Sequence, residues 1–396
     1  TRHLHISRDS VLEFDPVRPV RTDFVGRIAR KVKLAAPLWY DELRDAALFP
    51  HIRRTGNAVL RQDYEGHLTG AGKPAILAGA HQPGATPAVI IGMHWFELGG
   101  AELWAFDTIR LVREAGFLPI VLTNRDSHQP WIARAELDGA LLIPFSEPTA
   151  RSQTLGTEQL LRALLRAFDV RGVVVHHNQW LYDRLAWIRR SRPEIPIVDS
   201  THIVEYRGGG FPISAAVVTE SISLHHVISP TLADWFVNVQ GVSKDKVVMA
   251  PLGGLTVKPK RAAFRSQADG ELFTVAFVGR MARQKGPEVF AAMVRRLTQE
   301  RRPMRFIMHG DGELASWVDE IIRSMGLSTV IERRASASPV AATLAEAHLL
   351  VVSSHNEGLT LTTLEAIAQG VPVVSTDVGA QSDVIPGDAL VSRDVH

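Results

Sequence analysis

Short apolar segments alternate with amphipathic ones through most of this 396-residue chain, and this alternation limits the possible folds more than any single residue does. Apolar runs such as residues 87–95, 118–124 and 273–278 predict buried strands, and stretches such as 103–116 predict amphipathic helices. Buried strands separated by helices form parallel sheets that are covered on both faces. The sequence therefore predicts an α/β, doubly wound fold.

A polar stretch, residues 253–271, interrupts this alternation and is rich in basic and small residues. Such a composition is typical of a linker between domains. We therefore expect two Rossmann-like domains that face each other across an interdomain cleft. The expected organisation is a partly helical N-terminal extension (1–86), a first domain (87–255), a linker (256–270) and a second domain (271–396).

Composition narrows the class of protein. Apolar residues make up 45% of the chain and charged residues 22%, as in globular proteins with a sizeable core. The formal net charge of +2 gives no reason to expect a nucleic-acid partner. Cysteine is absent, which excludes disulfides and zinc–thiolate sites and is consistent with a reducing compartment. No apolar run reaches about 18 residues. We predict a cytoplasmic location.

The ends of the chain and its N-terminal extension raise separate questions. The chain begins TRHLHISRDS, without an initiator Met or a signal-peptide pattern, which predicts a fragment of a longer protein. Residues 24–49 mix basic and apolar residues. They could pack on the first domain, contact the inner membrane face peripherally through residues 25–40, or serve an upstream domain. We favour a packed, partly helical extension.

Doubly wound sheets bind ligands at the carboxyl ends of their strands, so the loops that follow strands are the candidate sites. In FVGRMARQKGPEVF, the strand 273–278 leads into Gly279 and Arg280, and Lys285 precedes a helix that Pro287 would begin. A guanidinium and an ammonium group in one loop suit a diphosphate. Two solvated basic residues on a surface loop are the alternative.

Two other loops contain glycines and carboxylates. Asp311 and Glu313 alternate with glycines and resemble a metal-binding acidic pair only superficially, so we interpret them as a turn before a helix. The pair Gly99–Gly100 either lets the backbone approach a ligand or forms a tight turn. It does not match the dinucleotide-binding pattern. We interpret Glu102 as a surface carboxylate at a helix start.

The 16 histidines include the doublets 176–177 and 225–226. Because neighbours on a strand point to opposite faces, each doublet should offer at most one imidazole to a given site, and we expect no metal cluster. His202 follows a predicted strand, where ligands bind, although an ordinary loop histidine is the default interpretation.

The stretch HNEGLTLTTLEAIAQGVPVV, residues 355–374, holds Glu357 in a loop and Glu365 in a helix. Thr362 and Glu365 match a capping box, and Gly370 should end the helix. The capping box does not explain Glu357. It also leaves N–H groups near Leu361 and Thr362 available to an anion.

Taken together, LGGAE, FVGR…KG, HGDGE and SSHNEGLTLTTLEAIAQGVPVVSTDVGA resemble the retaining, family-4-type glycosyltransferases (group 1) of the GT-B fold. The resemblance covers residues 87–394. It implies a metal-independent, cofactor-free transfer of a sugar, with retention, from a UDP- or GDP-sugar. The acceptor would be a hydroxyl of a glycan, a lipid-linked compound or a small molecule.

The resemblance also implies roles for individual residues, of which Arg280, Lys285, Glu357 and His202 would be catalytic. Arg280 and Lys285 would bind the diphosphate and stabilise the leaving group, while Glu357 would contact hydroxyls of the donor sugar. His202 would point at that sugar from the first domain. Glu365 would bind the ribose.

The remaining implied donor contacts are mainly backbone ones. N–H groups of Leu361 and Thr362 would hold the distal phosphate, and the backbone from Ile331 to Arg333 would hold the base. The implied donor site also includes Gly100, Gly279, Gly358 and Leu359.

The chain departs from the family pattern in two places. Thr360 stands where the family usually has a small residue or glycine, which would reshape the donor-sugar pocket. The chain also stops before the closing helices expected of the second domain. A sugar-nucleotide epimerase and a non-catalytic sugar-binding scaffold are the alternative functions, and the sequence leaves the oligomeric state open.

Overall fold

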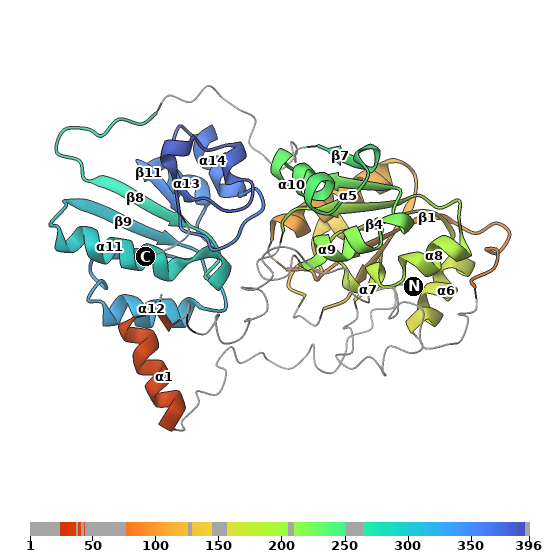
Figure 1. Ribbon diagram of the computed structural model, residues 1–396, viewed down its shortest axis with the longest axis horizontal. Coiled ribbons are helices and arrows are strands. Elements are labelled where there is room, and N and C mark those ends of the chain that lie inside the picture. The colour runs from red at the N-terminus through yellow and green to blue at the C-terminus, as the bar shows by residue number, and fades with distance from the viewer. Residues whose placement is uncertain are drawn as a thin grey trace. The chain divides into compact units, whose positions relative to one another are not determined.

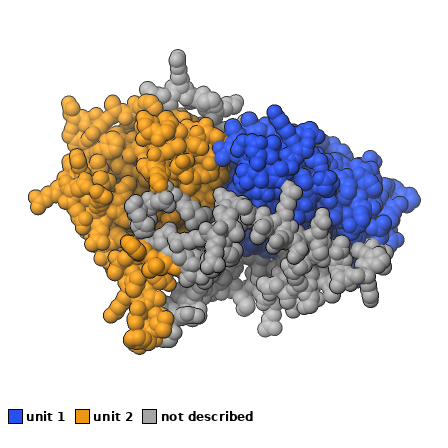
Figure 2. Space-filling model, viewed as in Figure 1, with its two compact units in different colours: residues 1–14, 58–204, 208–255 blue, residues 15–57, 205–207, 256–396 orange. Residues whose placement is uncertain are grey.

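The computed structural model describes most of the chain in two compact units (Figures 1 and 2). Unit 1 comprises residues 1–14, 58–204 and 208–255, and unit 2 comprises 15–57, 205–207 and 256–396. The structure describes residues 24–36, 39–40, 43, 77–97, 99–125, 129–144, 157–204, 210–250 and 264–392. Much of the predicted extension and residues 256–263 of the predicted linker lie outside these residues.

Unit 1 contains a seven-stranded parallel sheet with the strand order β3-β2-β1-β4-β5-β6-β7. Its strands are β1 (Pro87–Met93), β2 (Leu118–Thr123), β3 (Leu141–Ile143), β4 (Asp169–Val175), β5 (Ile197–Thr201), β6 (Leu224–Val227) and β7 (Val247–Met249). Its described α-helices are α5 (Gly100–Glu114), α6 (Thr157–Ala167), α7 (Gln179–Tyr182), α8 (Leu185–Ser191), α9 (Gly210–Val217) and α10 (Pro230–Asp234).

Alternate residues of the strands face two separate cores in unit 1. Val89 and Ile91 of β1 pack with Phe106 and Ile109 of α5 on one face. Ile90 packs on the opposite face, within the core that α6 and α8 cover. Helices therefore cover both faces of the sheet, as the period of the apolar segments predicts.

Unit 2 repeats this plan with six parallel strands in the order β10-β9-β8-β11-β12-β13. These are β8 (Phe273–Val278), β9 (Met304–His309), β10 (Ile331–Arg334), β11 (Leu349–Val352), β12 (Val373–Thr376) and β13 (Leu390–Val391). The helices are α1 (Phe24–Ala35), α11 (Pro287–Gln299), α12 (Ala315–Ser324), α13 (Val340–Glu346) and α14 (Leu361–Ala368). The prediction of two Rossmann-like, doubly wound domains is confirmed.

Helices cover both faces of the unit 2 sheet (Figure 1), and each face again has its own core. Val275 and Phe277 pack with α11 and α12, whereas Ala276 packs with α13 and α14. As predicted, the strand spans 273–278 and Pro287 is the first residue of α11.

Helix α1 packs on unit 2 and not on the first domain, which was one of the alternatives for the extension. It lies against α12, where Lys33 stands over the Trp317 ring with its Nζ 4.0 Å from the ring centroid. Arg30 pairs with Glu320, and Leu34 adds to the core of that face. No described helix is long and apolar enough to cross a membrane.

A buried carboxylate stabilises the carboxyl end of β5. Asp199 is fully buried and accepts hydrogen bonds from the Tyr182 hydroxyl and from Thr201 Oγ1, the latter at 2.9 Å. His225 Nδ1 lies 3.1 Å from the same carboxylate. Because three polar groups bond to one carboxylate, its removal would take a buried partner from each of them.

We expect Asp199→Ala to lower the free energy of unfolding by about 3 kcal/mol or more, because each buried group that loses its hydrogen-bond partner costs about 1–3 kcal/mol. Urea unfolding followed by circular dichroism measures this change. Asp269→Ala, which removes an exposed carboxylate in a turn, is the matched control and should change stability little. Equal stabilities of the two variants would contradict the importance of the network.

Candidate functional site

The strand orders place a switch point at the centre of each sheet. In unit 2, β8 lies between β9 and β11, and the chain leaves β8 toward one face and β11 toward the other. The loops that follow these two strands therefore diverge, and ligands of doubly wound proteins bind in the crevice that results. In unit 1 the corresponding strands are β1 and β4.

An ion pair joins the two loops at the switch point of unit 2. Lys285, at the end of a short 3-10 helix after β8, places its Nζ 2.6 Å from Oε1 of Glu357 in the loop after β11. Glu357 is 4% exposed and also accepts a 2.6 Å hydrogen bond from Ser354 Oγ. Such a buried carboxylate needs both partners to offset its desolvation.

Three further contacts fix the two loops against each other. The His355 amide donates to the carbonyl of Gln284, and its Nε2 lies 2.7 Å from Oε1 of the buried Glu288. Ser353 Oγ donates to the carbonyl of Gly286 at 2.8 Å. Lys285 and Glu357 thus lie on loops that are held rigidly from both sides.

Two glycines allow the backbones to approach this closely. Gly286 has φ 60°, and a Cβ there would lie 2.0 Å from the Ser353 carbonyl oxygen. Gly379 has φ 59°, and a Cβ there would lie 1.9 Å from the Glu357 carbonyl oxygen. Neither position accepts a side chain without displacing the loops of the site.

Arg280 lies in the same loop as Lys285, next to Gly279. It packs at Gly312, where an added Cβ would lie 2.9 Å from Arg280 Cγ. Its guanidinium forms no ion pair or hydrogen bond within the described part of the chain, so its charge is available. The loop that follows β8 therefore holds Lys285, which is paired, and Arg280, which has no ion-pair partner among the described residues.

Helix α14 begins at Leu361, directly after Thr360, and its start differs from the prediction. The N-cap is Thr360, whose side chain makes no capping hydrogen bond, so the capping box of Thr362 and Glu365 is wrong. The N–H groups of Thr363 and Leu364 are bonded to the Thr360 carbonyl oxygen. No partner for those of Leu361 and Thr362 is found among the described residues. Gly370 ends the helix with φ 75°, as predicted.

Glu365 lies in the second turn of α14, where burial raises its pKa above the ordinary value. Its carboxylate has no hydrogen-bond or ion-pair partner among the described residues. A carboxylate in this state is destabilising by itself and available to donors of a ligand.

The third loop at the carboxyl edge of the unit 2 sheet, which follows β9, forms a turn before α12. Asp311 accepts hydrogen bonds from the hydroxyl and amide of Ser336 at 2.7 and 2.6 Å, which lower its pKa. Glu313 is exposed beside Gly312. Among the described residues, no group of His, Asp and Glu could hold a metal ion.

A cavity of about 520 Å³ lies near the end of β10 and is lined by Asp311, Asp319, Arg333 and Arg334, among others. Ile331 begins β10 and Arg333 lies within it, so the predicted base-binding backbone is part of a strand. The Arg333 guanidinium is held by Asp319 at 2.9 Å and by the Met308 carbonyl oxygen at 3.0 Å.

Imidazoles gather at the carboxyl edge of the unit 1 sheet. His202 follows β5, is 6% exposed, and has its Nε2 2.9 Å from Ser200 Oγ. The rings of His176 and His177 lie 5.8 and 5.1 Å from its ring centroid. The expectation that this doublet offers only one imidazole is therefore wrong, because β4 ends at Val175 and His177 turns with φ 52°.

The second doublet follows the expectation. On β6, His225 and His226 point to opposite sides, toward Asp199 and Ser200 respectively. The difference arises because this doublet lies within a strand, where neighbouring side chains alternate.

Burial keeps the imidazoles of His176, His177 and His202 neutral. It lowers the pKa of His176 to about 3 and that of His177 to about 4, and it lowers the pKa of His202 as well. The cluster can exchange hydrogen bonds with a neutral polar group, but it brings no positive charge at physiological pH.

Gly100 is the first residue of α5, after the N-cap Gly99. Glu102 is buried and not a surface residue, which corrects the prediction. Its carboxylate folds back on Gly99, where an added Cβ would lie 2.0 Å from Glu102 Oε2. The paired glycines thus make room for a carboxylate of their own helix.

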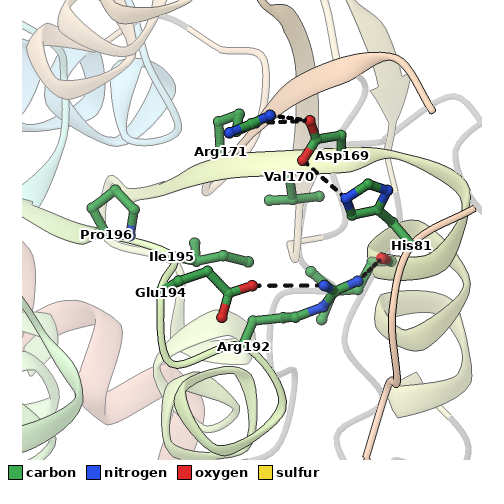
Figure 3. Close-up of a pocket in the computed structure, with 9 residues that line it drawn as sticks. His81, Asp169, Val170, Arg171, Arg192, Glu194, Ile195 and Pro196 are labelled. Carbon is green, nitrogen blue, oxygen red and sulfur yellow. Dashed lines mark hydrogen bonds and ion pairs between the residues drawn. The ribbon is translucent and has the colours of Figure 1, made fainter. Parts of the chain in front are cut away.

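A second cavity, about 440 Å³ in volume, lies in unit 1 at the other edge of the sheet (Figure 3). It borders Asp169, the first residue of β4, and residues 194–196, just before β5. Asp169 pairs with Arg171 at 2.6 Å and His81 at 3.4 Å, and Arg192 lies 3.6 Å from Glu194. This edge carries the amino ends of the strands, so we assign no ligand to it.

Comparisons with known proteins agree with the fold. The profile of the family described as "Glycosyl transferases group 1" matches residues 273–395. Residues 273–395 of unit 2 are thus similar to group 1 glycosyltransferases. Among solved structures, Anabaena Alr3699/HepE in complex with UDP-glucose has a TM-score of 0.58 and 15% identity, covering 77% of this chain and 85% of that one. The lipopolysaccharide outer core galactosyltransferase WaaB has a TM-score of 0.58 and 16% identity, covering 78% and 87%. At these identities the likeness establishes the GT-B fold.

Curated relatives extend the comparison to sequence. A D-inositol 3-phosphate glycosyltransferase of Kineococcus radiotolerans is 28% identical over 266 residues, which are 59% of this chain and 60% of that protein. A D-inositol 3-phosphate glycosyltransferase of Nocardia farcinica is 26% identical over 257 residues, which are 58% of this chain and 56% of that protein. The chain thus spans less than two thirds of the length of these relatives.

The sequence predicted Lys285 and Glu357 as site residues but not the side chains that bond to Glu357 or tie the two loops together, namely Ser353, Ser354, His355 and Glu288. The signal for Ser354 was present, because it stands three residues before Glu357 within the same loop. The His355–Glu288 contact joins residues 67 apart in sequence and leaves no local signal.

We expect Gly286→Ala to lower the free energy of unfolding by about 2 kcal/mol or more, because the left-handed backbone and the Ser353 carbonyl both oppose a Cβ. Thermal and urea unfolding measure the loss. Gly387→Ala, at a glycine with open space around its Cβ position, is the matched control. If both variants were equally stable, the close approach of the loops would be wrong.

Glu365→Gln should stabilise the ligand-free protein at pH 7. The folded-state pKa of Glu365 lies above its ordinary value of 4.5, so its ionised form is costly to bury at neutral pH. The gain should shrink as the pH falls through the folded pKa toward 4.5, where both states bind the proton. Urea midpoints at about pH 7 and about pH 5 test this. Glu313→Gln, at an exposed carboxylate, should give no such gain.

Proposed function

We propose that this protein is a glycosyltransferase that moves a sugar, with retention, from a nucleoside diphosphate sugar to a hydroxyl acceptor. The observation that carries the proposal is the Lys285–Glu357 ion pair at the switch point of unit 2, beside the Arg280 guanidinium, which has no partner among the described residues. The family of residues 273–395 and the GT-B fold support the same reaction.

The chemistry needs positive charge where the diphosphate departs. Breaking the sugar–phosphate bond leaves an oxocarbenium-like sugar and moves negative charge onto the leaving diphosphate. Arg280 and Lys285 stabilise that charge, and the departing phosphate oxygen takes the proton of the acceptor hydroxyl. Because Arg280 and Lys285 supply two fixed positive charges, we propose a transfer that uses neither a metal ion nor a cofactor.

Other groups at the carboxyl edge of the unit 2 sheet are assigned to the rest of the donor. The N–H groups of Leu361 and Thr362 suit the distal phosphate, since helix N-termini attract anions. Glu357, which already accepts from Lys285 and Ser354, is assigned to the sugar hydroxyls, and Glu365 to the ribose. The base is assigned to the cavity near the end of β10, beside the backbone from Ile331 to Arg333.

The donor and acceptor classes come from the relatives. UDP-glucose is bound by the Anabaena neighbour, which makes a UDP-sugar the first donor to test. The two curated relatives are named for inositol phosphate, which makes an inositol-type polyol the first acceptor. In unit 1, the neutral imidazole of His202 and the backbone at Gly100 are assigned to binding of the donor sugar. The cytoplasmic location, with peripheral contact at the inner membrane face, remains part of the proposal.

Removal of Arg280 should weaken nucleotide binding without disturbing the fold, because its guanidinium has no partner to lose among the described residues. A ligand at 100 times its dissociation constant stabilises a protein by about 2.7 kcal/mol, so UDP should raise the melting temperature of the wild type. In Arg280→Ala the UDP affinity should fall by about tenfold or more, as for a lost charge-assisted hydrogen bond. The ligand-free melting temperature should stay the same.

Turnover tests the catalytic role of the second cation. With donor and polyol acceptor, Lys285→Ala should lower kcat by on the order of 100-fold, whereas Lys244→Ala, at an exposed lysine, should leave it unchanged. Donor incubated alone and converted to an epimeric sugar nucleotide would indicate an epimerase instead. UDP binding with neither transfer nor hydrolysis would indicate a sugar-binding scaffold.

A further inference from the structure

Helix α1 presents its apolar residues away from the unit on which it packs. None of its residues is buried, and four apolar side chains are strongly exposed: Phe24 70%, Val25 66%, Ile28 47% and Val32 40%. A surface helix normally turns its apolar stripe toward the core and its charges toward solvent. In α1 the apolar stripe faces away from unit 2 and not toward its core. We therefore expect a second surface to bind the outer side of α1.

The contacts of α1 show which side faces the protein. Lys33 and Arg30 meet Trp317 and Glu320 of α12, and Leu34 adds to the core. At about 100° per residue, Phe24, Ile28 and Val32 form a stripe on the opposite side, because they are spaced by four. Figure 1 shows α1 extending from α12, away from the sheet of unit 2.

Two cations border this apolar stripe. Arg27 and Lys31 are also spaced by four, are exposed, and make no ion pair with other described residues. The sequence FVGRIARKVKLA contains four basic residues and no acidic one. An apolar stripe with a parallel row of exposed cations is the pattern of a helix that lies in the interface of an anionic membrane.

We propose that the outer side of α1, defined by Phe24, Val25, Arg27, Ile28, Lys31 and Val32, docks on an anionic lipid surface. The apolar stripe enters the boundary between headgroups and acyl chains, while Arg27 and Lys31 pair with lipid phosphates. Charge favours lipid over a second copy of this chain, because two copies meeting through this side would bring four like charges together, from Arg27 and Lys31 of each. The helix has 12 residues and lies on the surface without crossing it.

The consequence is a peripheral attachment through unit 2, the unit that holds the candidate donor site. Docking rests on α1 alone and is independent of the glycosyl transfer proposed above. The surface is also accessible to mutation, since its side chains are exposed and their replacement should not disturb the core.

Co-sedimentation of the full chain with vesicles tests the proposal. We expect binding to vesicles made of equal parts phosphatidylcholine and phosphatidylglycerol, weakening as salt rises, and no binding to phosphatidylcholine alone. Ile28→Asp/Val32→Asp and Arg27→Glu/Lys31→Glu should each lower partitioning by about tenfold or more. Unchanged melting temperatures and UDP responses would show that the variants remain folded.

Two control variants separate an effect of α1 from a general effect of added negative charge on the surface of unit 2. Leu272→Asp changes another exposed apolar residue of unit 2, and Arg295→Glu/Arg296→Glu makes the same charge change on α11; both should bind vesicles like the wild type. Equal binding to neutral vesicles, or wild-type binding by the α1 variants, would overturn the proposal. So would a dimer in sedimentation velocity that Ile28→Asp/Val32→Asp dissolves while vesicles are not bound, since the surface would then belong to a second copy.

Discussion

The Lys285–Glu357 ion pair depends on two neighbouring parallel strands whose following helices leave toward opposite faces of one sheet. Strands β8 and β11 are hydrogen-bonded in parallel register, so their carboxyl ends lie together. Helix α11 then packs with Val275 and Phe277, and α14 packs with Ala276, on the other face. Alternate apolar residues of one strand therefore pack helices on opposite faces of the sheet. Because α11 and α14 leave toward opposite faces, a crevice opens between the loops that precede them, and the site lies in it.

Holding a carboxylate in that crevice is costly, and the surrounding contacts reflect this. Glu357 is almost fully buried, so its desolvation must be offset by Lys285 and Ser354. The two loops are tied by Ser353 and His355, and Gly286 permits their contact. Arg280 and Glu365, by contrast, have no partners among the described residues. The site thus combines one satisfied ion pair with two charged groups that have no partner among the described residues and are open to a ligand.

The sequence predicted the doubly wound architecture because apolar strands and amphipathic helices have different periods. It was weaker where a contact decides the local structure. The capping box failed because α14 already begins at Leu361, before the Thr362 cap that the pattern predicted. The interpretation of Glu102 failed because Gly99 has no side chain to exclude its carboxylate. The prediction for His176 and His177 failed because the strand ends before them, which the apolar pattern alone does not reveal. The partners of the site residues lie on other loops and have no local signature.

The carboxyl edges of the two sheets differ in the kind of polar group that they offer. In unit 2 the edge carries ionised groups, of which Lys285 is paired and Arg280 has no partner among the described residues. In unit 1 burial keeps His176, His177 and His202 uncharged, so that edge supplies hydrogen bonds without charge. A diphosphate is stabilised by fixed cations, whereas sugar hydroxyls need only neutral donors and acceptors. The same kind of sheet in both units therefore supports two different chemistries, which favours the nucleotide in unit 2 and hydroxyl recognition in unit 1.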